Sequence, residues 1–218
     1  MERNINMDEI SDGKLYGLND MVKADCQDCK DCSACCCGMG NSIILDPLDI
    51  YRLTTGLNKS FEELLNGFME LNVADGVILP NLKMAGAGEK CAFLSNDGRC
   101  SIHNLRPGIC RLFPLGRFYE NGTFRYFLQI HECKMTNRTK IKVKKWIDTP
   151  NIKENERFIN DWHYFIKEIQ QKCRNSMDEQ YMKQINMEIL NDFYIKSYDG
   201  SREFYEQFYD RFQKYRQV

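Results

Sequence analysis

The sequence has 218 residues, with 30 basic and 31 acidic side chains, a formal net charge of −1 at pH 7 and 43% hydrophobic residues. A chain with nearly balanced charge has no overall attraction to nucleic acid or to an acidic membrane surface, and no apolar run approaches the roughly 20 residues of a membrane-spanning helix. We therefore expect a protein without a nucleic-acid partner or a membrane partner, long enough to bury a core.

Eleven residues are cysteines, and six of them lie in the stretch CQDCKDCSACCC from Cys26 to Cys37. Cysteines that serve as small core residues occur singly on apolar stripes, whereas the residues between these thiols are polar or small. The N-terminal residues show no apolar stretch typical of a secretory signal, so we expect a cytoplasmic protein. A reducing compartment disfavours disulfides, and the cysteine run therefore favours metal ligation.

The spacing of these thiols indicates how they would bind a metal. They stand at every third position and then in succession, at Cys26, Cys29, Cys32, Cys35, Cys36 and Cys37. Two residues between cysteines let the backbone curl so that both sulfurs reach one ion. Neighbouring Cβ atoms point apart in an extended or turning chain, so we expect Cys35 and Cys36 to serve two sites or one multi-iron cluster.

Three regions are expected in chain order. Residues 1–22 are polar and punctuated by glycine, which predicts a mostly irregular N-terminal arm. Residues 23–140 would form a cysteine-cluster metal-binding domain, and residues 141–218 a helical extension packed on it. The fold class is then α+β, with small β-hairpins and a cysteine-rich knot surrounded by helices, and with a C-terminal helical layer that shields the cluster.

Two helices are expected after the cysteine run. Asp46 and Pro47 are typical of an N-cap followed by proline at the first helical position, and this helix should end near Gly56. Ser60 and Glu63 form a capping-box pattern that predicts a second helix. The apolar spacing of both helices fits a buried face, so we interpret them as scaffold.

The remaining cysteines of the predicted domain stand near turns. Strands are expected at 91–94 and 99–103 around a Ser-Asn-Asp-Gly turn, which would bring Cys91 and Cys100 together. Pro107 should start a short helix that carries Cys110. A second hairpin, with strands at 118–120 and 123–128, is predicted around Asn121-Gly122, and Cys133 follows it.

The last third of the chain is helical in pattern. Apolar residues recur at spacings of three and four, which predicts helices at Ile152–Cys173, Asp178–Phe193 and Ser201–Tyr215. Cys173 lies in line with the apolar face of the first helix, so we expect it in the core rather than at a metal.

The order of cysteines and of the motif Arg106-Pro107-x2-Cys110-Arg111-x-Phe113-Pro114 resembles the CxxCxxCC, or YkgJ-type, cysteine-cluster family. The resemblance covers about Cys29 to Cys133 and implies a zinc- or iron-chelating domain. It implies as ligands Cys29, Cys32, Cys35, Cys36, Cys91, Cys100, Cys110 and Cys133. Cys26 and Cys37 are additional to the pattern and remain further ligand candidates.

Both iron–sulfur and zinc ligation fit eight thiols. The density of soft ligands favours an iron–sulfur cluster, and Cys26-x2-Cys29-x2-Cys32-x3-Cys36 matches bacterial ferredoxin spacing except for its final proline. A four-thiolate zinc site would instead carry two net negative charges. Nearby cations that could offset such charge are Lys90, Arg99, Arg106 and Arg111.

Three functions are compatible with this sequence. The first is an iron–sulfur protein of redox or protein and peptide modification chemistry, because flagellin lysine N-methylases share a related cysteine cluster. The second is a zinc-binding structural module with a protein or peptide partner, and the third is a metal-handling protein. No Gly-rich phosphate loop, nucleophile elbow or defined carboxylate pair supports kinase or hydrolase chemistry, and catalytic residues are not identified.

Overall fold

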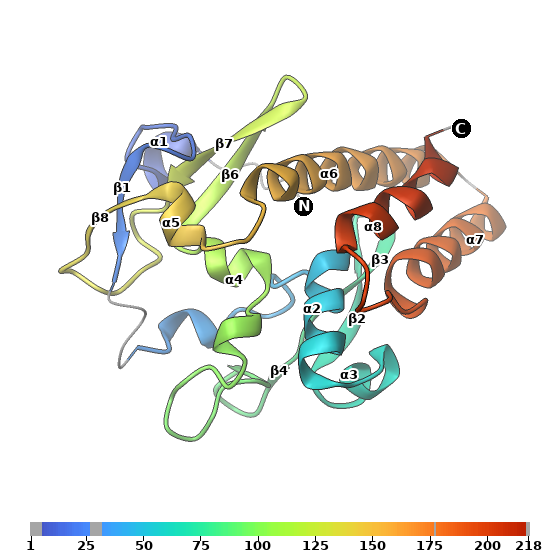
Figure 1. The fold of residues 1–218 in the computed structure, drawn as a ribbon, viewed down its shortest axis with the longest axis horizontal. Helices are drawn as coiled ribbons and strands as arrows, with labels where there is room; N and C mark the ends of the chain where they lie inside the picture. The colour runs from blue at the N-terminus through green and yellow to red at the C-terminus, as the bar shows by residue number, and fades with distance from the viewer. Residues whose placement is uncertain (1–5, 27–31, 177, 217–218) are drawn as a thin grey trace. The chain divides into compact units, whose positions relative to one another are not determined.

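The computed structural model describes residues 6–26, 32–176 and 178–216. The chain divides into two compact units (Figure 1). The first comprises Met1–Met39 with Met84–Asp161, and the second comprises Gly40–Lys83 with Trp162–Val218. Helices and small antiparallel sheets alternate along the chain, so the predicted α+β class is confirmed.

The first unit contains all the described cysteines except Cys173. Its helices and 3-10 turns are α1 (Met7–Ile10), η1 (Ala34–Cys36), η2 (His103–Leu105), α4 (Gly108–Leu112), α5 (Val143–Ile147) and the start of α6 (Ile152–Asn175). Its strands are β1 (Met21–Asp25), β4 (Met84–Ala85), β5 (Lys90–Cys91), β6 (Leu115–Glu120), β7 (Thr123–Leu128) and β8 (Thr139–Lys142). The strands pair antiparallel as β1–β8, β4–β5 and β6–β7.

The β6–β7 hairpin is the longest element of the first unit besides α6 (Figure 1). Asn121 and Gly122 connect its strands with φ angles of 53° and 77°, as a two-residue type I′ turn requires. The hairpin predicted from Asn121-Gly122 is therefore confirmed. Tyr126 pairs with Tyr16 through two backbone hydrogen bonds of 2.7 and 3.0 Å, which fasten the N-terminal arm along β7. The arm also contains the short helix α1, which was not predicted from the sequence.

The core of the first unit lies between these small sheets and α4 and α5. Its buried side chains are Tyr16, Val22, Ala24, Leu112, Leu115, Tyr126, Leu128, Val143 and Ile147. They come from segments distant in sequence, so burial of apolar surface is what joins the arm, the β6–β7 hairpin and the β1–β8 sheet.

The hairpin predicted around the Ser95-Asn96-Asp97-Gly98 turn is wrong in the length of its strands. Strands at 91–94 and 99–103 are replaced by the short β5 and a single bridge between Leu94 and Cys100. The Ser95 hydroxyl donates to the Arg99 carbonyl at 2.6 Å, and the Ser95 amide donates to the same oxygen at 2.9 Å. These local bonds favour a tight turn over a longer ladder. The turn still brings the two cysteine-bearing segments side by side.

The second unit contains the predicted scaffold helices, α2 (Pro47–Leu57) and α3 (Phe61–Gly67). Asp46 and Ser60 cap them in complete capping boxes with Asp49 and Glu63, which confirms both predicted starts. The unit further contains β2 (Met69–Ala74), β3 (Val77–Leu82), the rest of α6, α7 (Glu179–Leu190), a π-helical turn (Asn191–Ile195), α8 (Phe204–Phe212) and a 3-10 turn (Gln213–Tyr215).

An aromatic core holds the second unit together. The Trp162 ring lies 5.0 Å from Phe193 and 6.0 Å from Phe208, in edge-on contacts that aromatic rings favour. Cys173 is buried in this unit, which confirms its expected place in a core. The three predicted C-terminal helices are confirmed, with the second ending early in the π-helical turn. Packing of these helices over the cysteine cluster, and the boundaries drawn at residues 22 and 140, stay predictions.

Candidate metal centre

The described cysteines of the first unit form no disulfides with one another, and Cys29 lies outside the described residues. Cys26 and Cys91 are buried, and the others are half-buried. They fall into two groups according to which sulfurs influence one another. The first thiol group is Cys35, Cys36, Cys37, Cys91 and Cys100. The second thiol group is Cys26, Cys32 and Cys133.

Backbone pairing assembles the first thiol group. Cys37 forms an antiparallel bridge with Lys90, and the Gly38 amide donates to the Glu89 carbonyl at 2.9 Å. The early cysteine run therefore lies beside β5, which ends at Cys91. The bridge between Leu94 and Cys100 adds the last thiol.

The adjacent Cys35 and Cys36 thiols hydrogen-bond to each other. This bond lowers the pKa of Cys35 to about 7, with help from the Arg106 guanidinium. The same bond, burial, and the nearby Cys91 and Cys100 thiols raise the pKa of Cys36 well above its usual value. Both cysteines stand in the 3-10 turn η1. The expectation that they serve two sites or one multi-iron cluster stays a prediction.

Three sulfurs share one local arrangement. The backbone amide of Phe93 donates a hydrogen bond to Cys91, that of Ile102 to Cys100 and that of Met135 to Cys133. In each case the donor stands two residues after the cysteine. A hydrogen bond to sulfur favours the thiolate, which is the form that binds metal. Burial acts in the opposite direction and is the larger influence, so the pKa of each of these three thiols is raised.

The second thiol group surrounds a small cavity of about 10 Å³. Its walls also include Cys35, Phe113-Pro114 and residues 132–135. Burial raises the pKa of Cys133 first, and the neighbouring Cys26 and Cys32 thiols raise it further. The Arg138 guanidinium opposes this rise.

Cations lie beside both groups. Burial raises the pKa of Cys100, and the Arg106 and Arg99 guanidinium groups oppose this rise. These two arginines are among the four cations expected to offset thiolate charge. Arg111 instead donates to the backbone carbonyls of Arg106 and Asp148, both at 3.1 Å, and so fastens the turn before α4. Lys90 is exposed at the hairpin. The sequence did not identify Arg138 as a cation beside the Cys133 thiol. Its position five residues after Cys133 was the available signal.

Cys110 lies half-buried in the middle of α4, and its place as a ligand stays a prediction. In residues 6–26, 32–176 and 178–216, no three Cys, His, Asp or Glu side chains already converge in ion-binding geometry. The donor set nevertheless suits zinc or iron, because its members are soft thiols placed beside cations and backbone amides. Metal binding would release the thiol protons and draw the sulfurs together.

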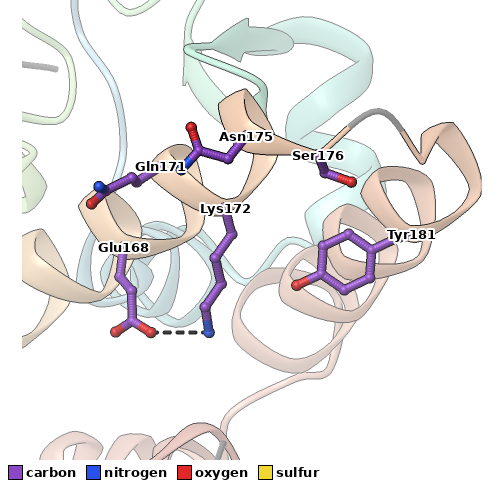
Figure 2. Close-up of a pocket in the computed structure, with 6 residues that line it drawn as sticks. All are labelled: Glu168, Gln171, Lys172, Asn175, Ser176 and Tyr181. Carbon is purple, nitrogen blue, oxygen red and sulfur yellow. Dashed lines mark ion pairs between the residues drawn. The ribbon is translucent and has the colours of Figure 1, made fainter.

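A second hollow, in the other unit, has no such chemistry (Figure 2). It is an open surface depression of about 550 Å³ where α6 approaches α7. Glu168 and Lys172 form an ion pair of 2.9 Å across its edge, and Tyr181 faces them from α7. Such an exposed pair one helical turn apart is an ordinary surface feature.

Residues 28–134 match the model of the CxxCxxCC family, described as "Putative zinc- or iron-chelating domain". This stretch belongs to the CxxCxxCC family. The match confirms the resemblance seen in the sequence and supports metal binding by the domain. Within the CxxCxxCC domain lie the whole first thiol group and two members of the second, whereas Cys26 precedes it.

The chain matches no curated protein and no solved structure. Across the described helices, none combines the length and the apolar character needed to cross a membrane.

Proposed function

We propose that the CxxCxxCC domain binds an iron–sulfur centre through the first thiol group, and that the protein works in redox or in protein and peptide modification. The observation that carries the proposal is the repeated amide-to-sulfur hydrogen bond, found at Cys91 and Cys100. Hydrogen bonds to cluster sulfurs tune reduction potential.

The number of thiols favours a cluster over a single ion. Five sulfurs share the first thiol group, whereas a tetrahedral zinc ion takes four. We assign Cys35, Cys36, Cys91 and Cys100 as the principal ligands, and Cys29, Cys32, Cys110 and Cys133 as the further thiols of the family pattern. When bound, such a centre exchanges electrons, and the protein's residues set its potential through charge and hydrogen bonding.

Charge near the first thiol group fits this role. Arg99 and Arg106 lie close enough to lower the pKa of the Cys100 thiol against the effect of its burial. Positive charge of this kind offsets the negative charge of bound thiolates and favours the reduced state of a cluster. Thiolate ligation needs reduced cysteines, so we place the protein in the cytoplasm, with a protein or peptide as its partner.

A zinc-binding structural module is the second candidate. The cavity of about 10 Å³ at the second thiol group has room for about one water-sized sphere and none for a substrate. Buried or half-buried thiols without access for a substrate are typical of structural zinc sites.

Reduction under anaerobic conditions tests the redox proposal. Protein purified without oxygen should show a visible absorption band that dithionite bleaches and an electron paramagnetic resonance signal that appears at the same time. The Arg106→Leu variant should shift the reduction potential to lower values, while Arg111→Leu should perturb folding of the turn without a specific shift. A colourless protein that contains zinc and gives no signal would support the second candidate instead.

A further inference from the structure

We propose that the outward face of the β1–β8 sheet, together with α5, binds a carboxylate-rich segment of a partner protein. The surface is a lysine patch of five exposed side chains: Lys23, Lys140, Lys142, Lys144 and Lys145. The inference rests on the proposed function for its purpose, since that function requires a protein or peptide partner. It adds the charge of that partner and the place where it docks.

The register of β1 with β8 places three of these lysines on one face. Met21 lies opposite Lys142, and both side chains are exposed. Val22 and Ile141 form the next pair, and both pack in the core of the first unit. Successive side chains of a strand point to opposite faces. The lysine of β1 and the second lysine of β8 stand two positions away in their strands and are also exposed, so they share the outward face.

The helix α5 extends the positive surface beyond the strands, because it follows β8 directly (Figure 1). Lys144 and Lys145 are exposed on it, whereas Val143 is buried. The Val143 amide donates to the Asp20 carbonyl at 3.1 Å, and the Lys144 amide donates to the Leu18 carbonyl at 3.0 Å. Backbone hydrogen bonds therefore hold this part of the patch, and the lysine side chains are not needed for it.

The charge of the lysine patch is not neutralised by ion pairs within the described part of the chain. None of its five side chains forms an ion pair or a hydrogen bond with another described residue. Asp20 and Asp25 bracket β1, and their carboxylates accept hydrogen bonds from the Gly17 amide at 2.7 Å and the Thr139 hydroxyl at 3.2 Å. Like charges on neighbouring positions of a strand pair are destabilising. An external anion would relieve that repulsion.

Protection of a strand edge does not account for the whole lysine patch. Lysines on exposed edge strands hinder pairing with other chains, and this reason applies to β1 and β8. Lys144 and Lys145 lie in a helix, which presents no unpaired strand edge. A positive surface that continues from the strands into the helix fits a docking surface.

Met21 favours an acidic protein over nucleic acid as the partner. Its side chain is 48% exposed and lies opposite a lysine. Protein interfaces are enriched in methionine at their centre and are polar at their rim. Single-stranded nucleic acid is instead held by stacking on aromatic rings, and the outward positions described in β1 and β8 carry none. The patch also lacks arginine, whose planar group suits phosphate better than lysine does.

The position of the patch connects it with the cysteines. Asp25 pairs with Thr139 at one end of the β1–β8 sheet. Cys26 follows Asp25 directly, and the loop that leads into β8 carries Cys133. A partner on the outward face is therefore anchored to the two strands that adjoin the second thiol group.

Peptide binding to matched variants tests the proposal. The probes are two fluorescent peptides of glutamates around a central leucine or a central glycine, and a single-stranded DNA of equal charge. Binding to the full chain, purified anaerobically, is measured by fluorescence anisotropy, and circular dichroism reports folding. The patch variant combines Lys23→Gln, Lys140→Gln and Lys142→Gln. The control variant removes three exposed lysines elsewhere, through Lys153→Gln, Lys183→Gln and Lys196→Gln.

The expected result is a loss of binding that depends on position and not only on total charge. Wild type and the control variant should bind the leucine peptide alike, and the patch variant should bind it about tenfold more weakly. High salt should weaken binding to wild type because it screens exposed charges. Met21→Gln should lose the preference for leucine over glycine, and an unchanged preference would overturn the apolar contact at Met21.

The remaining outcomes separate the docking surface from the proposed function. Equal binding of the peptide by the patch variant and wild type, or no binding by wild type, would overturn the docking surface. Tighter binding of the DNA than of either peptide, lost in the patch variant, would overturn it in favour of a nucleic-acid surface. Wild type without iron that still binds the peptide through the patch would count against the iron–sulfur centre and support the docking surface. If the patch variant misfolds, Lys144→Gln with Lys145→Gln decides by the same comparison, because both lie outside the strands.

Discussion

Cys37 and Lys90 pair as an isolated antiparallel bridge, and this pairing joins the early cysteine run to the strand that ends at Cys91. Neither side chain makes the connection, because the bridge lies in the backbone. The arrangement of the first thiol group therefore depends on one short contact between segments separated by some fifty residues of sequence.

Breaking that contact should release metal without altering a thiol. The hydrogen bond of this bridge runs from the Gly38 amide to the Glu89 carbonyl. Proline at position 90 therefore acts by fixing φ and placing its ring in β5, which disturbs the pairing of this strand with Cys37 and with β4. We expect Lys90→Pro to lose most of its iron, whereas Lys90→Ala, which changes only the charged side chain, should keep it. Iron and sulfide analysis of both variants makes the comparison. Full metal in Lys90→Pro would show that the backbone pairings of β5 with Cys37 and with β4 do not organise the ligands.

Substitution of single cysteines should separate ligation from stability. Cys100→Ser should lose the metal of the first thiol group, because a hydroxyl is a poor substitute for a thiolate ligand. Cys173→Ser places a hydroxyl in the aromatic core of the second unit and should cost about 1–3 kcal/mol of stability, with metal content unchanged. Metal content is measured by elemental analysis and stability by denaturant unfolding. Equal metal in the two variants would remove Cys100 from the ligand set.

Glu156 should make stability depend on pH. Burial raises the pKa of its carboxyl, although the Tyr126 hydroxyl donates a hydrogen bond to it at 3.0 Å. A raised pKa means that the folded state disfavours the charged form, so this contribution to stability is present at acid pH and is lost as pH rises through the folded pKa. Glu156→Gln keeps an acceptor for Tyr126 and should melt higher than wild type at pH 7, but not at pH 4. A melting difference that does not grow between pH 4 and pH 7 would contradict this account.

Gly76 should tolerate no side chain. Its φ is 87°, and an added Cβ would lie 3.0 Å from Cβ of Cys173. We expect Gly76→Ala to cost about 1–3 kcal/mol in unfolding free energy, without loss of metal from the first unit. Gly67→Ala is the matched control, because no atom lies within 4 Å of its added Cβ and its φ is not positive. Gly76→Ala should cost almost the same in a Cys173→Ala background, because alanine at 173 keeps the contacting Cβ and the φ of residue 76 stays positive.

Local signals in the sequence predicted much of the fold. Capping boxes at Asp46 and Ser60 and the Asn121-Gly122 turn each depend on residues within a few positions, and each predicted element is present. The strands at 91–94 and 99–103 were wrong because hydrogen bonds of Ser95 stabilise a tighter turn. Pairing of β1 with β8 joins segments more than a hundred residues apart, and no local pattern reports it.

For the candidate site too, local sequence predicts some features and only the fold determines the others. Which residues carry thiols is plain from the sequence, and the family pattern named most of them. The grouping of the thiols is not plain from the sequence. Cys91 and Cys100 raise the pKa of Cys36, whereas Cys26 and Cys32 raise that of Cys133. In two-cluster bacterial ferredoxins with this spacing, the fourth cysteine ligates a different cluster from the first three, so the spacing alone does not predict which thiols Cys36 joins. Alternation of Val22, Ala24 and Cys26 was the available sign that Cys26 faces inward.

Analysis of the wild-type chain for iron, acid-labile sulfide and zinc after anaerobic purification tests the central claim most directly. The account predicts iron and acid-labile sulfide in similar amounts. A chain that contains neither iron nor zinc under these conditions, with every cysteine reactive toward a thiol reagent, would contradict it.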